Sequence, residues 1–284
     1  MPQPMSDSIF GKVQAISSML FLGVDQTGAI RPKSRKSQRG PRKSVAADQA
    51  QPLPCCWLIG CDIEFGELED FNSSSIQSVL GSRNNLSIAV DVVLGLPQSH
   101  PQSWRSAMAK AARQDRLGRD AAEKFFEELA KDLPPGDSGH RRVDRKVGAM
   151  SVFQAKPYQR NVQTGTYRIW RDLGRDPDWF TAPEIEKRAT GVPLYEAYPS
   201  FIWQTLLGFR RRSPEFLSSW LRSQRSLKLK WSASHQRLVE KSTDHADAFV
   251  VALALREAYA NGNLPDSCEC HPEGWILGVP RDSN

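Results

Sequence analysis

Two apolar runs of strand length each carry a single aspartate, and this feature constrains the fold more than any other part of the sequence. The first run, Met19 to Val24, ends at Asp25, and the second, Leu86 to Leu94, is interrupted by Asp91. Because an isolated carboxylate is expensive to remove from water, each aspartate needs an arginine, several hydrogen-bond donors or a cation as a partner. For either residue alone, a hydrogen-bonding role at the end of a strand is the simpler interpretation.

The rest of the pattern predicts one α/β domain over residues 1–284, with a central mixed five-stranded sheet flanked by helices. Besides the two runs that carry aspartates, strand-like segments occur at 55–63, 64–70 and 194–201. Helical segments are expected at 75–80, 103–132 and 243–260. With 39% apolar and 25% charged residues, the composition is that of an ordinary globular protein.

Two elaborations of this core are expected, and both carry basic residues. A loop insertion at 31–52 cannot pack a core, and its basic side chains are Arg31, Lys33, Arg35, Lys36, Arg39, Arg42 and Lys43. It is either a charged insertion that keeps the chain soluble or an arm that neutralises phosphates. A helical and irregular insertion, or lid, is expected at about 98–192. There Arg141 and Arg142 belong to an interleaved basic and aromatic pattern that can bind nucleic acid, or that can cap the core.

Charge and cysteine content bear on partners and location. The net charge of +6 favours a polyanionic partner such as nucleic acid. No apolar run reaches the length of a membrane span, so we expect no membrane partner. Five cysteines without an export signal predict reduced thiols in a cytoplasmic protein. Cys268, Cys270 and His271 lack the paired spacing of structural zinc sites, so these cysteines are interpreted as ordinary thiols.

A second acidic feature lies at the start of the last predicted helix. Asp244 and Asp247 are three residues apart and therefore share one helix face. Taken alone they need no metal, because acidic residues in a first turn stabilise the helix dipole. Combined with the strand residues Asp25 and Asp91, however, they form a set suited to two hard cations such as Mg2+ or Mn2+. Two such ions about 4 Å apart can stabilise the attacking and leaving oxygens of phosphodiester hydrolysis.

The order of these elements resembles the RNase H-like superfamily. Residues 244–254 resemble the final helix of RuvC-type resolvases. Four further pieces, in order along the chain, resemble the DUF429 family of predicted RNase H-like nucleases. They are Gly23-Val24-Asp25, Ala89-Val90-Asp91 through Gly95-Leu96-Pro97, Tyr195-Glu196-Ala197-Tyr198-Pro199, and Glu273-Gly274-Trp275-Ile276 to Pro280.

The resemblance implies a Mg2+- or Mn2+-dependent nuclease with a two-metal-ion mechanism. Asp25 would bridge the metals, Asp91 would bind one of them, and Asp247 with Asp244 would complete the catalytic site from the helix. Glu196 is an additional catalytic candidate; pairing with a nearby arginine or capping the next helix would explain it equally well. Because resolvase-like relatives act as dimers, a homodimer is a further implication.

Two other functions remain open from the sequence. The segment Gly23 to Gly28 also resembles the first phosphate loop of sugar kinases and actin-like ATPases, which implies a phosphotransferase. A second Asp-Gly-rich phosphate loop, which that class requires, is absent from the sequence. A non-catalytic nucleic-acid-binding protein that keeps the fold is the third hypothesis, because a family resemblance gives a fold more securely than an activity.

Overall fold

The computed structural model describes residues 18–26, 50–81, 85–154, 160–182, 191–224, 227–264 and 273–280. Most of the predicted basic loop (31–49), together with Cys268, Cys270 and His271, lies outside the described residues. In the described ranges no helix has both the length and the apolar character needed to cross a membrane. Cys55, Cys56 and Cys61 are free thiols.

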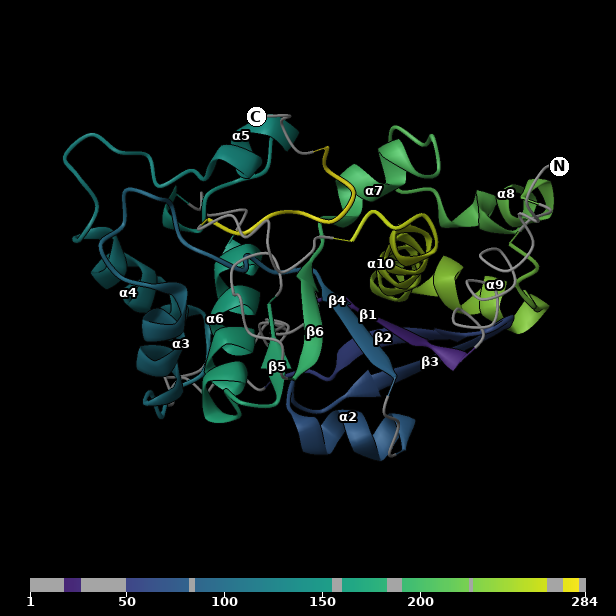
Figure 1. The fold of residues 1–284 in the computed structure, drawn as a ribbon, viewed down its shortest axis with the longest axis horizontal. Coiled ribbons are helices and arrows are strands. Elements are labelled where there is room, and N and C mark those ends of the chain that lie inside the picture. Colours follow the sequence, from purple (N-terminus) through teal and green to yellow (C-terminus); the bar gives the residue numbers. More distant parts are fainter. Residues whose placement is uncertain are drawn as a thin grey trace, which may run out of the picture.

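The structure has an α/β fold built on one mixed sheet, with strand order β3-β2-β1-β4-β6-β5 (Figure 1). The strands are β1 (Leu20–Val24), β2 (Leu53–Ile59), β3 (Asp62–Leu68), β4 (Leu86–Val90), β5 (Phe180–Thr181) and β6 (Val192–Glu196). β1 is antiparallel to β2 and parallel to β4, and β6 is parallel to both β4 and β5. The expected number of five strands was too low, because the two-residue β5 is too short to give a periodic signal.

Helices cover both faces of the sheet (Figure 1). They are α2 (Ser73–Leu80), α3 (Trp104–Ala112), α4 (Arg119–Ala130), α5 (Arg142–Val147), α6 (Arg160–Arg175), α7 (Pro199–Thr205), α8 (Leu217–Ser223), α9 (Ala233–Lys241) and α10 (Thr243–Ala260). Short 3-10 turns, η1 (Val152–Gln154) and η3 (Pro214–Phe216), complete the set. The helix predicted at 243–260 is thereby confirmed.

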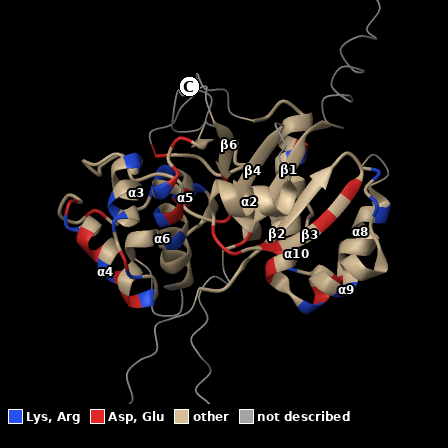
Figure 2. Ribbon diagram, turned by 90° about the horizontal axis from the view of Figure 1, so that it is seen from below, with Lys and Arg blue, Asp and Glu red and all other residues tan. Residues whose placement is uncertain are grey.

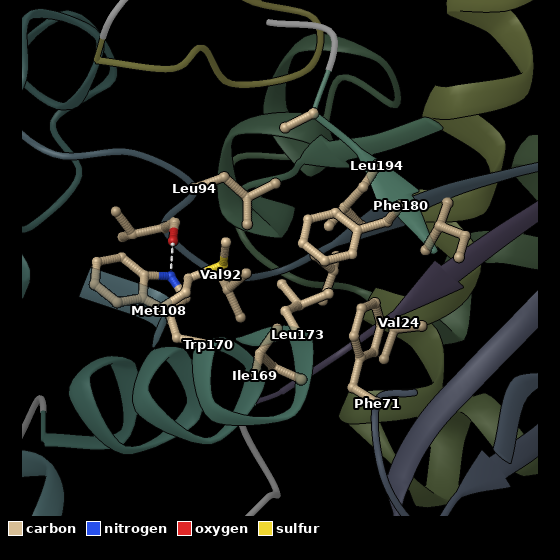
Figure 3. Packing of buried hydrophobic residues seen from close by; sticks show 14 of the residues in the cluster. Val24, Phe71, Val92, Leu94, Met108, Ile169, Trp170, Leu173, Phe180 and Leu194 are labelled. Atoms are coloured by element: carbon tan, nitrogen blue, oxygen red, sulfur yellow. Dashed lines mark hydrogen bonds between the residues drawn. The ribbon is translucent and has the colours of Figure 1, made fainter. Parts of the chain in front are cut away.

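Successive side chains of β1 point to opposite faces of the sheet, so the core has two layers. Leu22 and Val24 pack on one face with Ile169 and Trp170 of α6, where the indole Nε1 of Trp170 donates to the carbonyl of Val93 at 2.7 Å (Figure 3). Phe21 packs on the other face, against α10. The insertion that the sequence analysis interpreted as a lid therefore supplies, through α6, one of the two helical layers of the core.

The long helix predicted at 103–132 is instead two helices. α3 and α4 are separated at 113–118, where Gly118 has a φ of 132°, a value in the region that favours glycine. The hydroxyl of Tyr167 donates to the carbonyl of Arg116 at 2.9 Å and so fixes the connection to α6. Helix propensity alone favours one continuous helix, and this tertiary packing overrides it.

One glycine sets the distance between β1 and α10. A Cβ atom on Gly23 would lie 2.2 Å from the carbonyl oxygen of Ala248 and 2.4 Å from the backbone nitrogen of Ala252. Only glycine therefore permits the helix to approach the strand this closely. The consequence is that the first turns of α10 lie directly beside the end of β1, where Asp25 follows.

Candidate acidic site

Asp25 and Asp91 lie side by side at the carboxyl ends of two neighbouring parallel strands. Val24 of β1 is in register with Val90 of β4, and the backbone N–H of Asp91 donates to the carbonyl of Val24 at 3.0 Å. Both aspartates are buried, and their side chains are hydrogen-bonded to each other. Burial and the neighbouring charge of Asp25 both raise the pKa of Asp91, which favours its neutral form beside Asp25.

α10 adds a third carboxyl group, Asp247, from the same side of the sheet. Its side chain is fully buried, and its Oδ1 accepts a hydrogen bond from the indole Nε1 of Trp203 at 2.6 Å. Its Oδ2 lies 2.8 Å from Nη1 of Arg212, whose side chain is 32% exposed. The N-cap of α10 is Ser242, which accepts from the backbone N–H of His245, so Asp247 lies in the second turn of a well-formed helix.

The pKa values of Asp91 and Asp247 show that these two groups and Asp25 act on one another. Burial raises the pKa of Asp91 well above its ordinary value, the charges of Asp25 and Asp247 raise it further, and Arg212 lowers it. Burial likewise raises the pKa of Asp247 to about 7, against the lowering effect of Arg212. Three buried carboxyl groups thus share one nearby guanidinium, and negative charge is in excess.

Asp244, the fourth predicted ligand, lies one turn earlier on α10 and is only partly buried. Its charge raises the pKa of Asp247, but it is the smallest of the causes. The structure therefore gathers three of the four predicted aspartates closely and leaves Asp244 at the rim of the cluster.

The donor chemistry fits a hard divalent cation, whereas the present side-chain arrangement does not yet provide a finished site. Carboxylate oxygens are the preferred ligands of Mg2+ and Mn2+, and the excess negative charge would be neutralised by such an ion. Yet, in the part of the chain that the structure describes, no group of three His, Cys, Asp or Glu side chains is arranged to hold a metal. Arg212 pairs with Asp247 and offsets part of the negative charge of the cluster.

Glu196 lies on the opposite face of the sheet from this cluster. It is in register with Val90, which packs in the α6 layer, so its side chain also points to that layer. Nη1 and Nη2 of Arg141 bind its two carboxylate oxygens at 2.6 and 2.5 Å, and the N–H of Leu94 donates to it at 2.7 Å. Burial raises the pKa of Glu196 to about 7, although Arg141 lowers it. Of the interpretations that the sequence left open, pairing with an arginine is the one observed.

The prediction that Arg141 binds nucleic acid was wrong. Its side chain is 1% exposed and also binds Asp144 Oδ1 at 2.6 Å, together with the carbonyls of Leu94 and Glu273. These partners use the guanidinium donors inside the protein, so no phosphate can reach them. Arg142, by contrast, is exposed on α5. Of the predicted basic arm, Arg31, Lys33, Arg35, Lys36, Arg39, Arg42 and Lys43 lie outside the described residues.

Sequence reasoning missed two residues of the acidic site, Trp203 and Arg212. The run Arg210-Arg211-Arg212 was visible, but nothing local indicates which of three consecutive arginines turns inward. Trp203 lies on α7 and follows the segment that ends in Pro199. A buried tryptophan whose N–H needs an acceptor is a usable signal only once its neighbours in space are known.

Comparison of the chain with family models, with curated proteins and with solved structures gives no match. The functional argument therefore rests on the geometry and charge of the acidic site.

Proposed function

We propose that this protein is a metal-dependent nuclease with an RNase H-like fold. The observation that carries the proposal is the meeting of Asp25, Asp91 and Asp247 at the carboxyl ends of β1 and β4, beside the first turns of α10. The topology supports it, because β1 is antiparallel to β2 and parallel to β4, as the resemblance to RNase H-like proteins implies. The resemblance to the DUF429 family is part of the same proposal.

In this proposal Asp25, Asp91 and Asp247 hold Mg2+ or Mn2+, with Asp244 at the rim. When bound, the metal would neutralise the carboxylates and activate a water molecule for attack on phosphorus. Trp203 holds the Asp247 carboxyl in one orientation through its 2.6 Å hydrogen bond. Arg212 has to release Asp247 for a cation to replace it, and its partial exposure leaves the guanidinium room to turn.

The experiment compares metal binding and cleavage in the same samples. Mg2+ and Mn2+ are titrated calorimetrically into the wild type, Asp25→Asn, Asp247→Asn and the exposed control Asp120→Asn on α4. Each sample is then assayed on labelled single- and double-stranded DNA and RNA. We expect the two site variants to lose binding and cleavage together while circular dichroism shows a folded protein, and the control to retain both. Cleavage that survives Asp25→Asn in a clean preparation contradicts the proposal.

A non-catalytic nucleic-acid-binding protein is the second candidate, and one observation favours it. Arg212 pairs with Asp247, and burial raises the pKa of both Asp91 and Asp247 toward their neutral forms, so the cluster can be stabilised without a metal. This function predicts strongly salt-dependent binding of nucleic acid without metal-dependent turnover. Calorimetry that detects no cation binding by the wild type, even with nucleic acid present, would favour it over the nuclease.

A further inference from the structure

A basic groove lies on the helical insertion. The helices α3 and α4 that help to form it lie on the side of the molecule away from α8 and α9 (Figure 2). It is formed by the end of α3, the 113–118 connection and α4, and encloses about 810 Å3. The basic side chains that line it are Lys110, Arg113, Arg116, Lys124 and Lys131.

Most of this positive charge is uncompensated. Lys110, Arg113, Arg116 and Lys124 are exposed, and among the described residues their side chains make no hydrogen bond or ion pair. The fifth cation, Lys131, pairs with Glu128 at 2.5 Å. Asp132, the other acidic residue of the lining, accepts a hydrogen bond from Gln102. Four cations held near one another without protein partners attract a counterion.

The framework that carries these cations is packed, so the backbone positions from which they project are fixed. α3 lies against α6 so closely that a Cβ on Gly174 would be 2.4 Å from the carbonyl oxygen of Met108. Phe125 of α4 is buried, with its ring centroid 5.2 Å from that of Tyr167 on α6. The end of α3, the 113–118 connection and α4 each contribute basic residues to this one groove.

We propose that this groove binds the phosphodiester backbone of nucleic acid and anchors the substrate at a distance from the acidic site. The inference rests on the proposed nuclease function for the identity of the anion. A chain of regularly spaced phosphates can contact several fixed cations at once and releases its condensed counterions on binding. Four of its cations are exposed, which suits phosphate contacts, whereas the aromatic residue in its lining, Phe125, is too buried to stack on bases.

The test compares two variants that change the net charge equally. Arg113→Glu/Lys124→Glu reverses charge in the groove, and Arg237→Glu/Lys241→Glu does so at two exposed positions on α9. Binding of a fluorescent 30-nucleotide DNA, single-stranded or duplex, is measured by anisotropy in EDTA from 0.05 to 0.3 M salt. Thermal denaturation checks that both variants are folded.

We expect the groove variant to bind at least about tenfold more weakly at 0.15 M salt. The slope of log K against log salt should fall by about two for a duplex, because each lost phosphate contact lowers it by about 0.9. The α9 variant should keep most of the affinity, since charges farther away than about 8 Å are screened at this salt. Equal losses in the two variants would overturn the proposal, because net charge alone would then explain the binding.

Two further measurements test whether the anion that binds the groove is nucleic acid. Inorganic phosphate at 10 mM and constant ionic strength should not displace the DNA; displacement would indicate a small-anion site and overturn the proposal. Phosphatidylserine vesicles that bind in a groove-dependent manner, with no groove-dependent DNA binding, would overturn it in favour of a membrane surface.

Failure of this inference is distinguishable from failure of the nuclease proposal. Groove-dependent DNA binding in EDTA, without metal-dependent cleavage, would leave the groove assignment standing and remove the nuclease function. Cleavage that depends on Asp25, with groove and α9 variants binding alike, would remove the groove assignment only.

Discussion

Asp247→Asn is expected to stabilise the protein at and above neutral pH. The carboxyl group of Asp247 is fully buried, and its pKa is raised from 3.8 to about 7, first by burial and then by the charge of Asp25. Since one pKa unit corresponds to 1.36 kcal/mol, ionisation of Asp247 costs about 4 kcal/mol of folding free energy once the pH exceeds about 7. Asparagine removes that charge and keeps an oxygen acceptor for the indole N–H of Trp203.

The sign of the pH dependence follows from the direction of the shift. The folded state binds the Asp247 proton more tightly than the unfolded state does, so this residue contributes stability below pH 4 that is lost between about pH 4 and 7. The variant should therefore match the wild type near about pH 3, exceed it by about 1 kcal/mol at pH 4.5 and exceed it by up to about 4 kcal/mol at pH 8. For a chain of this size that corresponds to a melting temperature higher by about 7 °C.

Urea and thermal denaturation at half-unit steps from pH 4.5 to 8.5 would measure this difference. Glu196, whose pKa is also raised to about 7, titrates in the same range and contributes to the wild-type slope. Subtracting the wild type from the variant at each pH removes that contribution. The exposed control Asp120→Asn should show no such gain. If Asp247→Asn were less stable than the wild type at pH 8, Arg212 would outweigh burial, and the reasoning would be refuted.

Three further substitutions test other parts of the structure. Gly23→Ala forces a Cβ to 2.2 Å from the carbonyl of Ala248 and should lower the unfolding free energy by about 2 kcal/mol or more in urea denaturation. Arg141→Met leaves Glu196 and its neighbours without their buried cation and should cost about 3–5 kcal/mol at pH 8 by the same assay. Arg212→Ala removes the cation that competes for Asp247, so calorimetry should show Mn2+ binding several-fold tighter than in the wild type; the exposed control Arg211→Ala should leave it unchanged.

The features of the fold that arise from local pattern could be predicted from the sequence. A buried strand such as β4 gives a continuous apolar run. The stop signal Asn261-Gly262 marks the end of α10. Both patterns depend only on residues near in sequence. The helix at 243–260 occurs where it was expected, whereas two predicted strands extended too far. β4 ends at Val90, and β6 ends at Glu196 before α7 begins at Pro199. The proximity of Asp25 and Asp91 follows as well, because both residues end parallel strands that prove to be neighbours.

What escaped prediction depends on contacts between distant residues. The break between α3 and α4 needs Tyr167, which lies some 50 positions away and donates to the carbonyl of Arg116. The role of α6 as a core layer, in place of a lid, depends on Trp170 meeting the backbone at Val93. Neither contact can be recognised from the local pattern of charged and apolar residues. The sequence therefore predicted one long helix at 103–132 and a lid at about 98–192.

Strand alternation explains which acidic residues belong to the site. Phe21, Gly23 and Asp25 alternate with residues that face α6, so Asp25 points toward α10, whereas Glu196 is in register with Val90 and points the other way. A different arginine pairs with the acidic residue on each face. Arg212 binds Asp247 on the α10 side, and Arg141 binds Glu196 on the α6 side. The two differ in exposure, 32% against 1%, and this difference separates their roles. Arg141 is a fixed structural counterion, whereas the partly exposed Arg212 is the one that would have to release its carboxylate if, as proposed, a cation binds the cluster.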